Sequence, residues 1–503
     1  MSSSTSSPVP LFKIKVAQKG LIKDVKEVVC RVVGLPSCLN GQIVDLGRGV
    51  RGIIMGYDQN EVMVLVLGDP GKLRMGGDVV GIDEPFVIPV GMGFIGRMVS
   101  ALGDPCDQQG DIKADAYYPV MCDSPSIVKR DPPDEFLATG TKIVDAIIPL
   151  AKGQRMLIVG DRVTGKTTIA VDAILNQKDR NMLCIYCCIG KSVSALEKVL
   201  TTLREKDALS YTAIVAASDS SPVGEQYLVP YAATSLAEYF ASKGKNVLVV
   251  FDDLTKHAWA YRQLSLLLER PPGREAYPGD IFYVQTQLME RAGCFNIQHG
   301  DGSISFIGIA ETLQGDLTGY IPSNLASICD GQICMSSTLF AEGMRPAIDF
   351  TISLTIIGAR VQPPIVKKLA SQLRVDFARF SELIQLSKLQ TGLSKEAEQI
   401  VTRGQTIQAA LKQGSGQPVP VPHLVLCLYA LKIDEVVSLS RPQKEKFFEN
   451  LLAYVKAHNP VLLEQLDEVS DLTALIEQGL EKLIRKYLLE EFQVGLEKTG
   501  DTP

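Results

Sequence analysis

The sequence predicts an α/β fold in which a core with a parallel β-sheet lies between an N-terminal β-barrel and a C-terminal helical bundle. Three observations predict it. Short runs rich in valine and isoleucine, broken by turn residues, fill the beginning of the chain. Continuous apolar runs then alternate with helical stretches, and the end of the chain has leucines at helical spacing. With 503 residues, the chain is long enough for several domains.

The barrel is predicted from five short runs at residues 28–33, 42–46, 52–55, 61–67 and 79–81. Strands of that length at such close spacing are typical of a small closed barrel. We therefore assign residues 1–19 to a short N-terminal arm, 20–94 to the barrel domain, 95–368 to the core and 369–503 to the helical domain.

The core is predicted from apolar runs at 156–159, 183–186, 213–216 and 247–251, which alternate with helical stretches. This alternation indicates a parallel sheet that is covered on both faces. Near the end of the chain one helix is expected to bury a single face, made of Leu472, Leu475, Ile476, Leu480, Leu483, Tyr487 and Leu488. Its polar face mixes acidic and basic residues, which favours packing in a bundle over binding to a membrane surface.

The net charge and the hydropathy of the chain exclude some kinds of binding partner. The net charge is -6, so there is no basic excess to neutralise a phosphate backbone, and we expect no nucleic-acid partner. No apolar run is long enough to predict a membrane-spanning helix, so any membrane association is expected to be peripheral.

A phosphate-binding loop is predicted where MLIVGDRVTGKTTIA passes from an apolar strand into a helix. Glycines at the first and sixth positions let backbone N–H groups surround phosphate oxygens at the amino end of the helix. Lys166 is expected to reach the β- and γ-phosphates, and the Thr167 hydroxyl is expected to ligate magnesium. The predicted nucleotide-binding residues of this loop are Gly160, Asp161, Arg162, Val163, Thr164, Gly165, Lys166, Thr167 and Thr168.

A second element of the same site is the strand NVLVVFDDL, which ends in Asp252 and Asp253. A carboxylate at the carboxyl end of a parallel strand faces the phosphates and can hold the magnesium shell. We assign this role to Asp252, so the predicted ligands are Mg²⁺ with ATP or ADP.

Several longer stretches give the chain a family resemblance. TGTKIVDAIIPLAKGQR, GDRVTGKT, YRQLSLLLERPPGREAYPGDIFY, PSNLASICDGQI and GMRPAIDF together resemble the alpha subunits of F-type ATP synthases, over nearly the whole chain. The resemblance implies a RecA-like core between a barrel and a helical bundle. It also implies a ring of three alpha and three beta subunits around a gamma subunit, with a delta-type stator subunit.

Such a complex couples a proton or sodium gradient to ATP synthesis from ADP and phosphate. It is expected at the cytoplasmic face of a bacterial inner membrane, or alternatively at an organelle inner or thylakoid membrane. The alpha site of the family binds nucleotide without turning it over. The resemblance carries an adenine pocket over to Phe340, Arg345 and Gln413, while Ser415 stands where the family usually has a second glutamine.

Two departures concern catalysis within the chain. Catalytic relatives have a glutamate after the glycine at the end of the next strand, but here Lys191 follows Gly190. A lysine does not activate water as a carboxylate does, so no catalytic residue is predicted in cis. Val163 also stands where alpha subunits have glutamine.

A third departure concerns the interface to the neighbouring subunit. The family pattern Ser-Val-Ser-Arg-Val-Gly contains an arginine that reaches the γ-phosphate of the beta site. Alignment of TISLTIIGARVQ on Ser353 and Gly358 places Ile356 at the arginine position. Arg360 follows four residues later and is a possible substitute if the local backbone takes another route.

Two other functions remain open at this point. The first is a divergent paralogue that assembles with the complex but has a structural or regulatory role, which Ile356, Lys191 and Val163 favour. The second is a stand-alone hexameric motor, such as a secretion ATPase or a transcription-termination helicase. The acidic balance opposes the helicase, and the missing glutamate after Gly190 opposes both motors.

Overall fold

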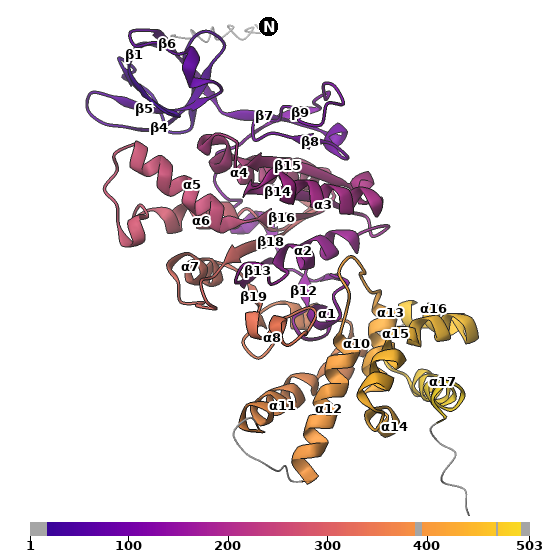
Figure 1. Ribbon diagram of the computed structural model, residues 1–503. Helices are drawn as coiled ribbons and strands as arrows, with labels where there is room; N and C mark the ends of the chain where they lie inside the picture. Colours follow the sequence, from indigo (N-terminus) through magenta and orange to yellow (C-terminus); the bar gives the residue numbers. More distant parts are fainter. Residues whose placement is uncertain (1–17, 388–394, 469–470, 494–503) are drawn as a thin grey trace, which may run out of the picture.

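The computed structural model describes residues 18–387, 395–468 and 471–493, and it confirms the predicted α/β core between a barrel and a helical domain (Figure 1). The three parts follow one another in chain order, with the barrel at the top of Figure 1 and the C-terminal helices at the bottom. Residues 1–17 of the predicted N-terminal arm lie outside the described residues.

The barrel closes in the order β1-β2-β5-β4-β3-β6. Its strands are β1 (Gln18–Lys26), β2 (Val29–Val33), β3 (Gln42–Asp45), β4 (Arg51–Tyr57), β5 (Val62–Leu67) and β6 (Asp78–Pro85). Five of the six correspond to the predicted apolar runs. β1 was not predicted, because Ile22 is its only large apolar side chain in the buried core and the strand is otherwise polar or half-exposed.

The central sheet has the strand order β20-β19-β13-β18-β16-β14-β15-β8. Its strands are β8 (Met98–Val99), β13 (Arg155–Gly160), β14 (Met182–Lys191), β15 (Thr212–Ser218), β16 (Asn246–Asp252), β18 (Ser303–Glu311), β19 (Gly331–Cys334) and β20 (Leu354–Thr355). From β19 to β8 every neighbouring pair is parallel, and β20 joins β19 antiparallel. Shorter pairs flank the sheet: β7 (Val87–Val90) with β9 (Ala116–Pro119), β10 (Arg130–Asp131) with β17 (Gly293–Phe295), and β11 (Phe136–Leu137) with β12 (Leu150–Ala151).

Both faces of the sheet are buried, which explains the continuous apolar strands. Met156 and Ile158 point into one hydrophobic cluster, while Leu157 and Val159 between them point into another. The first face is covered by α2 (Lys166–Leu175) and α3 (Val193–Glu205). The second is covered by α4 (Val223–Ser242), α5 (Leu254–Leu267), α6 (Ile281–Met289) and α7 (Tyr320–Ile328).

The first cluster continues without a break into the C-terminal helices. Phe350 packs on Phe377 with ring centroids 4.0 Å apart, and the same cluster extends to Leu451 and Leu480. The C-terminal helices are α10 (Pro364–Ala370), α11 (Leu373–Ser387), α12 (Lys395–Leu411), α13 (Val421–Ala430), α14 (Asp434–Val437), α15 (Arg441–His458), α16 (Pro460–Glu468) and α17 (Ala474–Phe492). The predicted domain boundaries at residues 94 and 368 stay predictions. β7 follows the barrel strands before residue 94, and α10 spans residue 368.

The predicted buried face of the last helix needs one correction. Ile476, Leu480, Leu483, Tyr487 and Leu488 are buried in α17 as predicted, and Leu472 is buried just before it. Leu475, however, is 74% exposed, because it lies beside the stripe that repeats every three or four residues from Ile476. Ile484 is buried in its place. Among the described residues, no helix combines the length and the apolar character needed to cross a bilayer.

Candidate functional site

The predicted phosphate loop joins β13 to α2, and two close fits determine its path. At Gly160 a Cβ atom would lie 2.6 Å from the Cβ atom of Met335, so only glycine lets β13 run this close to the residue after β19. Gly165, directly before α2, has a φ of 99°, which favours glycine. The loop therefore turns sharply into the amino end of the helix, which is the geometry of a phosphate cradle.

The loop is also braced by hydrogen bonds within the chain. Thr164 Oγ1 donates to the Asp161 carbonyl at 2.8 Å. The Asp161 carboxylate accepts from Thr312 Oγ1 and from the Gly315 N–H, both at 2.7 Å. Asp161 therefore holds the loop against the end of β18, and its negative charge is used in the framework.

The side chains of the loop differ in burial and in the groups that they contact. Lys166 is buried, and its Nζ donates to the carbonyls of Gly160 at 2.8 Å and Asp161 at 2.6 Å, while burial lowers its pKa. Arg162 is exposed and pairs with Glu311 at 3.0 Å. Val163 is 85% exposed at the tip of the loop. Lys166 thus lies folded along the loop, beside the amino end of α2.

Next to the loop, the Asp252 carboxylate gathers three side chains. Its Oδ2 atom accepts from Thr167 Oγ1 and from Tyr186 Oη, each at 2.8 Å. Its Oδ1 atom forms an ion pair with the Lys191 ammonium, which also donates to Thr167 Oγ1 at 2.8 Å. We call Asp252, Thr167, Tyr186 and Lys191 the Asp252 cluster. The structure thus brings the two predicted magnesium ligands together.

The register of the sheet explains why Lys191 reaches this position. β14 runs parallel to β16, with Cys188 opposite Asp252, so Lys191 lies just beyond the carboxylate at the same sheet edge. The pairing of β14 with β15 shifts between Ile189 and Lys191, where Gly190 has a φ of 60°. This bulge re-aims the side chain that follows it.

Magnesium fits poorly into the Asp252 cluster as it stands. Thr167 and Asp252 offer the oxygen atoms that the metal prefers. However, the Lys191 ammonium already contacts both of them, and Thr167 donates its own proton to Asp252. The described residues also contain no group of three or more His, Cys, Asp or Glu side chains placed to hold a metal.

Asp253, the second carboxylate of the motif, has a structural role. It is buried and accepts from the Lys256 N–H at 2.8 Å, which caps the amino end of α5. Burial, and then the neighbouring Asp252 charge, raise its pKa to about 7.

A cavity of about 370 Å³ opens beside the phosphate loop. Thr164, Gly165 and Thr168 form its loop side, and Phe340, Arg345, Gln413 and Ser415 belong to the remaining wall. The predicted base-binding residues therefore share one cavity with the phosphate loop. The Arg345 guanidinium lies over the Phe340 ring, 3.5 Å from its centroid.

Gln413 has a further role that the sequence did not indicate. Its amide oxygen accepts from the Lys142 N–H at 2.9 Å, at the start of α1 (Lys142–Ile147). Its amide nitrogen donates to the carbonyls of Gly140 at 2.7 Å and Gln417 at 2.8 Å. Both N–H groups and the oxygen are therefore used to join the core to the segment after α12.

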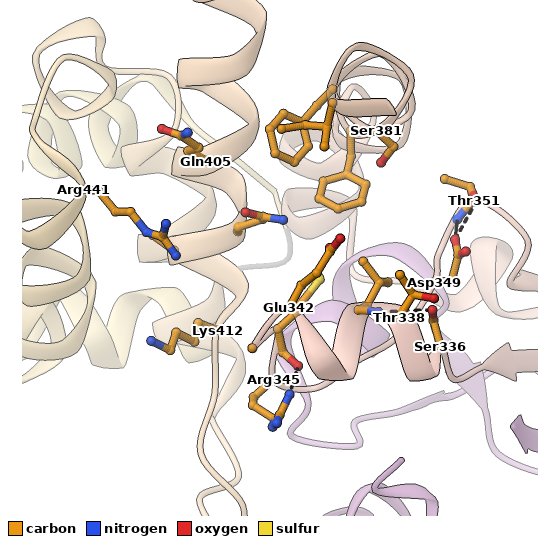
Figure 2. A pocket seen from close by; sticks show the side chains of 18 of the residues that line it. Ser336, Thr338, Glu342, Arg345, Asp349, Thr351, Ser381, Gln405, Lys412 and Arg441 are labelled. Atoms are coloured by element: carbon orange, nitrogen blue, oxygen red, sulfur yellow. Dashed lines mark hydrogen bonds between the residues drawn. The ribbon is translucent and has the colours of Figure 1, made fainter. Parts of the chain in front are cut away.

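A second cavity of about 560 Å³ lies between the core and the C-terminal helices (Figure 2). Figure 2 shows Gln405, Lys412 and Arg441 on the helical side and Ser336, Thr338 and Asp349 across from them. Arg345 lines both cavities, and α8 (Ser337–Ala341) contributes Leu339 to this one and Phe340 to the first. α8 therefore forms a thin wall between them.

Hydrogen bonds and one close packing contact hold the segment with the predicted interface residues in place. Ser353 Oγ accepts from the Cys334 N–H at 2.8 Å and donates to the Asp349 carbonyl at 2.6 Å. The Ile356 N–H donates to the Asp330 carbonyl at 2.9 Å. At Gly358, the first residue of α9 (Gly358–Val361), a Cβ atom would lie 1.6 Å from the Pro149 carbonyl oxygen.

These contacts leave both predicted interface side chains in solvent, together with Ile352 and Leu354. Ile356 is 69% exposed, and Arg360 is also exposed on α9. Gly358 has no room for a side chain, because a Cβ atom would meet the Pro149 carbonyl. The assignment of the arginine position to Ile356 stays a prediction.

Tyr186 was not predicted as part of the site. It lies in the apolar run 183–186, which indicates only a buried strand. Asp172 was also not predicted; it lines the smaller cavity and accepts from the Gly416 N–H at 2.9 Å, and burial raises its pKa to about 6. In both cases the neighbours come from distant parts of the chain.

Comparisons with known proteins cover all three parts of the chain. The nucleotide-binding domain of the ATP synthase alpha/beta family matches residues 140–355, its C-terminal domain matches 362–487, and its beta-barrel domain matches 15–81. ATP synthase subunit alpha of Clostridium acetobutylicum is 40% identical over 94% of both chains. ATP synthase subunit alpha 1 of Psychromonas ingrahamii is 43% identical over 83% of this chain and 81% of its own.

The raised pKa of Asp253 predicts a pH dependence of stability. Above the pKa of an unfolded aspartate, near 3.9, the folded chain binds more protons than the unfolded chain, so stability falls as the pH rises towards about 7. Asp253→Asn should reduce this slope and keep the helix cap. Urea unfolding between pH 5 and 8 measures it, with Asp207→Asn, at an exposed aspartate, as the control. Equal slopes for wild type and Asp253→Asn would contradict the prediction.

Proposed function

This chain belongs to the family of ATP synthase alpha subunits, and from that premise we propose that it is a non-catalytic, nucleotide-binding subunit of a rotary ATP synthase. It alternates with beta subunits in a ring of three and three around a gamma subunit, and a delta-type stator subunit holds the ring. The complex couples a proton or sodium gradient to ATP synthesis from ADP and phosphate. It lies at the cytoplasmic face of a bacterial inner membrane, with an organelle inner or thylakoid membrane as the alternative.

The observation that carries the non-catalytic role is the position of Lys191. Hydrolysis needs a group that orients or deprotonates water beside the γ-phosphate. Lys191 is an ammonium there, and it is bonded to Thr167 and Asp252. The carboxylates of Asp161, Asp253 and Glu311 are used by the loop brace, the cap of α5 and the pair with Arg162.

Nucleotide binding is supported by the continuity of the phosphate loop with the 370 Å³ cavity. The phosphates would lie at the amino end of α2, where Lys166 can leave the loop carbonyls for them. The base would enter the cavity beside Phe340 and Arg345. Gln413 would shape the wall, because its amide is already bonded to the backbone. Magnesium could reach Thr167 and Asp252 only after Lys191 leaves them.

A second candidate function is a divergent structural or regulatory paralogue of alpha, which Ile356 favours. An apolar side chain at the interface position supplies no charge to a neighbouring site. A trans arginine in phosphoryl transfer is worth about 10³ to 10⁵ in rate. In that case the ring would assemble with this chain but turn over slowly.

The first prediction from this function is nucleotide binding that depends on Lys166. Lys166→Ala should weaken ATP binding by about 1.5–3 kcal/mol, the usual contribution of hydrogen bonds to charged groups. Titration calorimetry of the full chain measures the affinity. Lys178→Ala, which removes an exposed lysine just beyond α2, is the matched control and should bind like wild type. Equal affinities for all three chains would remove the loop from the site.

The second prediction is that the purified chain hydrolyses ATP negligibly by itself. A coupled phosphate-release assay measures this directly. Turnover near the ~1 s⁻¹ at the low end of ordinary enzymes would instead support a stand-alone motor.

The third prediction concerns Ile356 in a ring reconstituted with beta and gamma subunits. Ile356→Arg should raise steady-state hydrolysis, since a guanidinium at the γ-phosphate lowers the barrier by about 4–7 kcal/mol. Arg360→Ala should have little effect on the hydrolysis rate if this segment supplies no charge to the neighbouring site. If Arg360 supplies the charge, the pattern reverses: Arg360→Ala abolishes activity and Ile356→Arg changes little. Normal wild-type rates that are indifferent to Arg360→Ala would refute both versions.

A further inference from the structure

We propose that Lys191 takes the place of the divalent cation, so that this chain binds ATP or ADP free of magnesium. The proposal deepens the nucleotide binding proposed for this chain and depends on it. It identifies the ligand as the metal-free nucleotide anion, and it assigns Lys191 a direct role in holding the phosphates.

The first argument is that the two oxygen groups that would ligate a metal already contact the Lys191 ammonium. Thr167 Oγ1 donates one hydrogen bond, to Asp252, and accepts one, from Lys191. Both Asp252 oxygens are also occupied, one by Lys191 and the other by Thr167 and Tyr186. A metal at this place would have to displace the Lys191 ammonium from both residues.

The second argument is the burial of Asp252. Its side chain is 0% exposed, and Lys191 supplies its only ion pair in the described structure. Removing one partner of a buried ion pair is strongly destabilising, because the remaining charge is left uncompensated. Lys191 is 20% exposed, so it reaches the carboxylate from the open edge of the site, beside the phosphate loop. It can therefore contact Asp252 and an incoming phosphate at once.

The third argument is charge. Magnesium in a phosphate-loop site screens the phosphates from each other and from the strand carboxylate. Here an ammonium fixed on Thr167 and Asp252 performs both tasks, and Lys166 adds a second ammonium that lies along the loop carbonyls. A divalent ion added at the same place would stand within a few ångströms of that ammonium and be repelled by it.

The experiment measures ATP affinity of the full chain by calorimetry, in buffer with magnesium and in buffer with EDTA. Wild type should bind ATP at least as tightly in EDTA as in magnesium, because magnesium complexes most of the free nucleotide anion that the site takes. Lys191→Gln leaves Asp252 and the phosphates without a counter-charge, so its affinity should fall about tenfold or more when magnesium is removed. Lys191→Arg keeps the charge and should respond to EDTA as wild type does. Lys198→Gln removes an exposed lysine of α3 and serves as the matched control.

A second readout follows the metal directly. Mn²⁺, a paramagnetic substitute for magnesium, should become immobilised on the Lys191→Gln chain with ATP, but not on wild type. Electron paramagnetic resonance distinguishes the two. Thermal unfolding without nucleotide establishes that each variant is folded.

Three outcomes would overturn the proposal. A wild type that loses tenfold affinity in EDTA requires the metal, although nucleotide binding itself stands. A wild type and a Lys191→Gln variant that respond alike to EDTA show that Lys191 is not the replacing cation. A wild type that binds no nucleotide in either buffer removes the proposed function, and the metal-free binding with it.

Discussion

The neutralisation of one buried carboxylate determines the arrangement of the site. Asp252 ends a central strand with its side chain fully buried, where an isolated charge would be very unfavourable. Lys191 and Tyr186 come from the neighbouring strand, and Thr167 comes from the first turn of the helix after the phosphate loop. A single charge thus links β14, β16 and α2, the three elements that meet beside the phosphate loop.

Much of the fold could be predicted from the sequence because its signals are local. The phosphate loop needs glycines at fixed spacing, and the parallel sheet needs apolar runs on both faces. β1 was not found because its pattern is mostly polar, and Leu475 was misplaced because leucine occurs on both sides of the helical stripe.

The candidate site depends on contacts between distant residues, which local sequence patterns do not predict. The sequence indicated that Lys191 does not act as a base, but not that its ammonium contacts Thr167 and Asp252. That contact depends on the register of two strands and on the bulge at Gly190. Gln413 is similar: residues distant in sequence satisfy its amide, so its bridging role is visible only in three dimensions.

The unbroken core between the sheet and the C-terminal helices limits how the chain can be divided. Phe350 and Phe377 belong to one apolar cluster that runs from under the sheet to α17. Gln413 and Lys142 add hydrogen bonds at the same junction, where Lys142 Nζ donates to the carbonyls of Ala410 and Lys412. The barrel has a separate inner cluster. The helical domain is therefore no interchangeable module: a chimaera that exchanges it with a relative has to exchange the matching sheet face too, whereas the barrel interior can diverge independently.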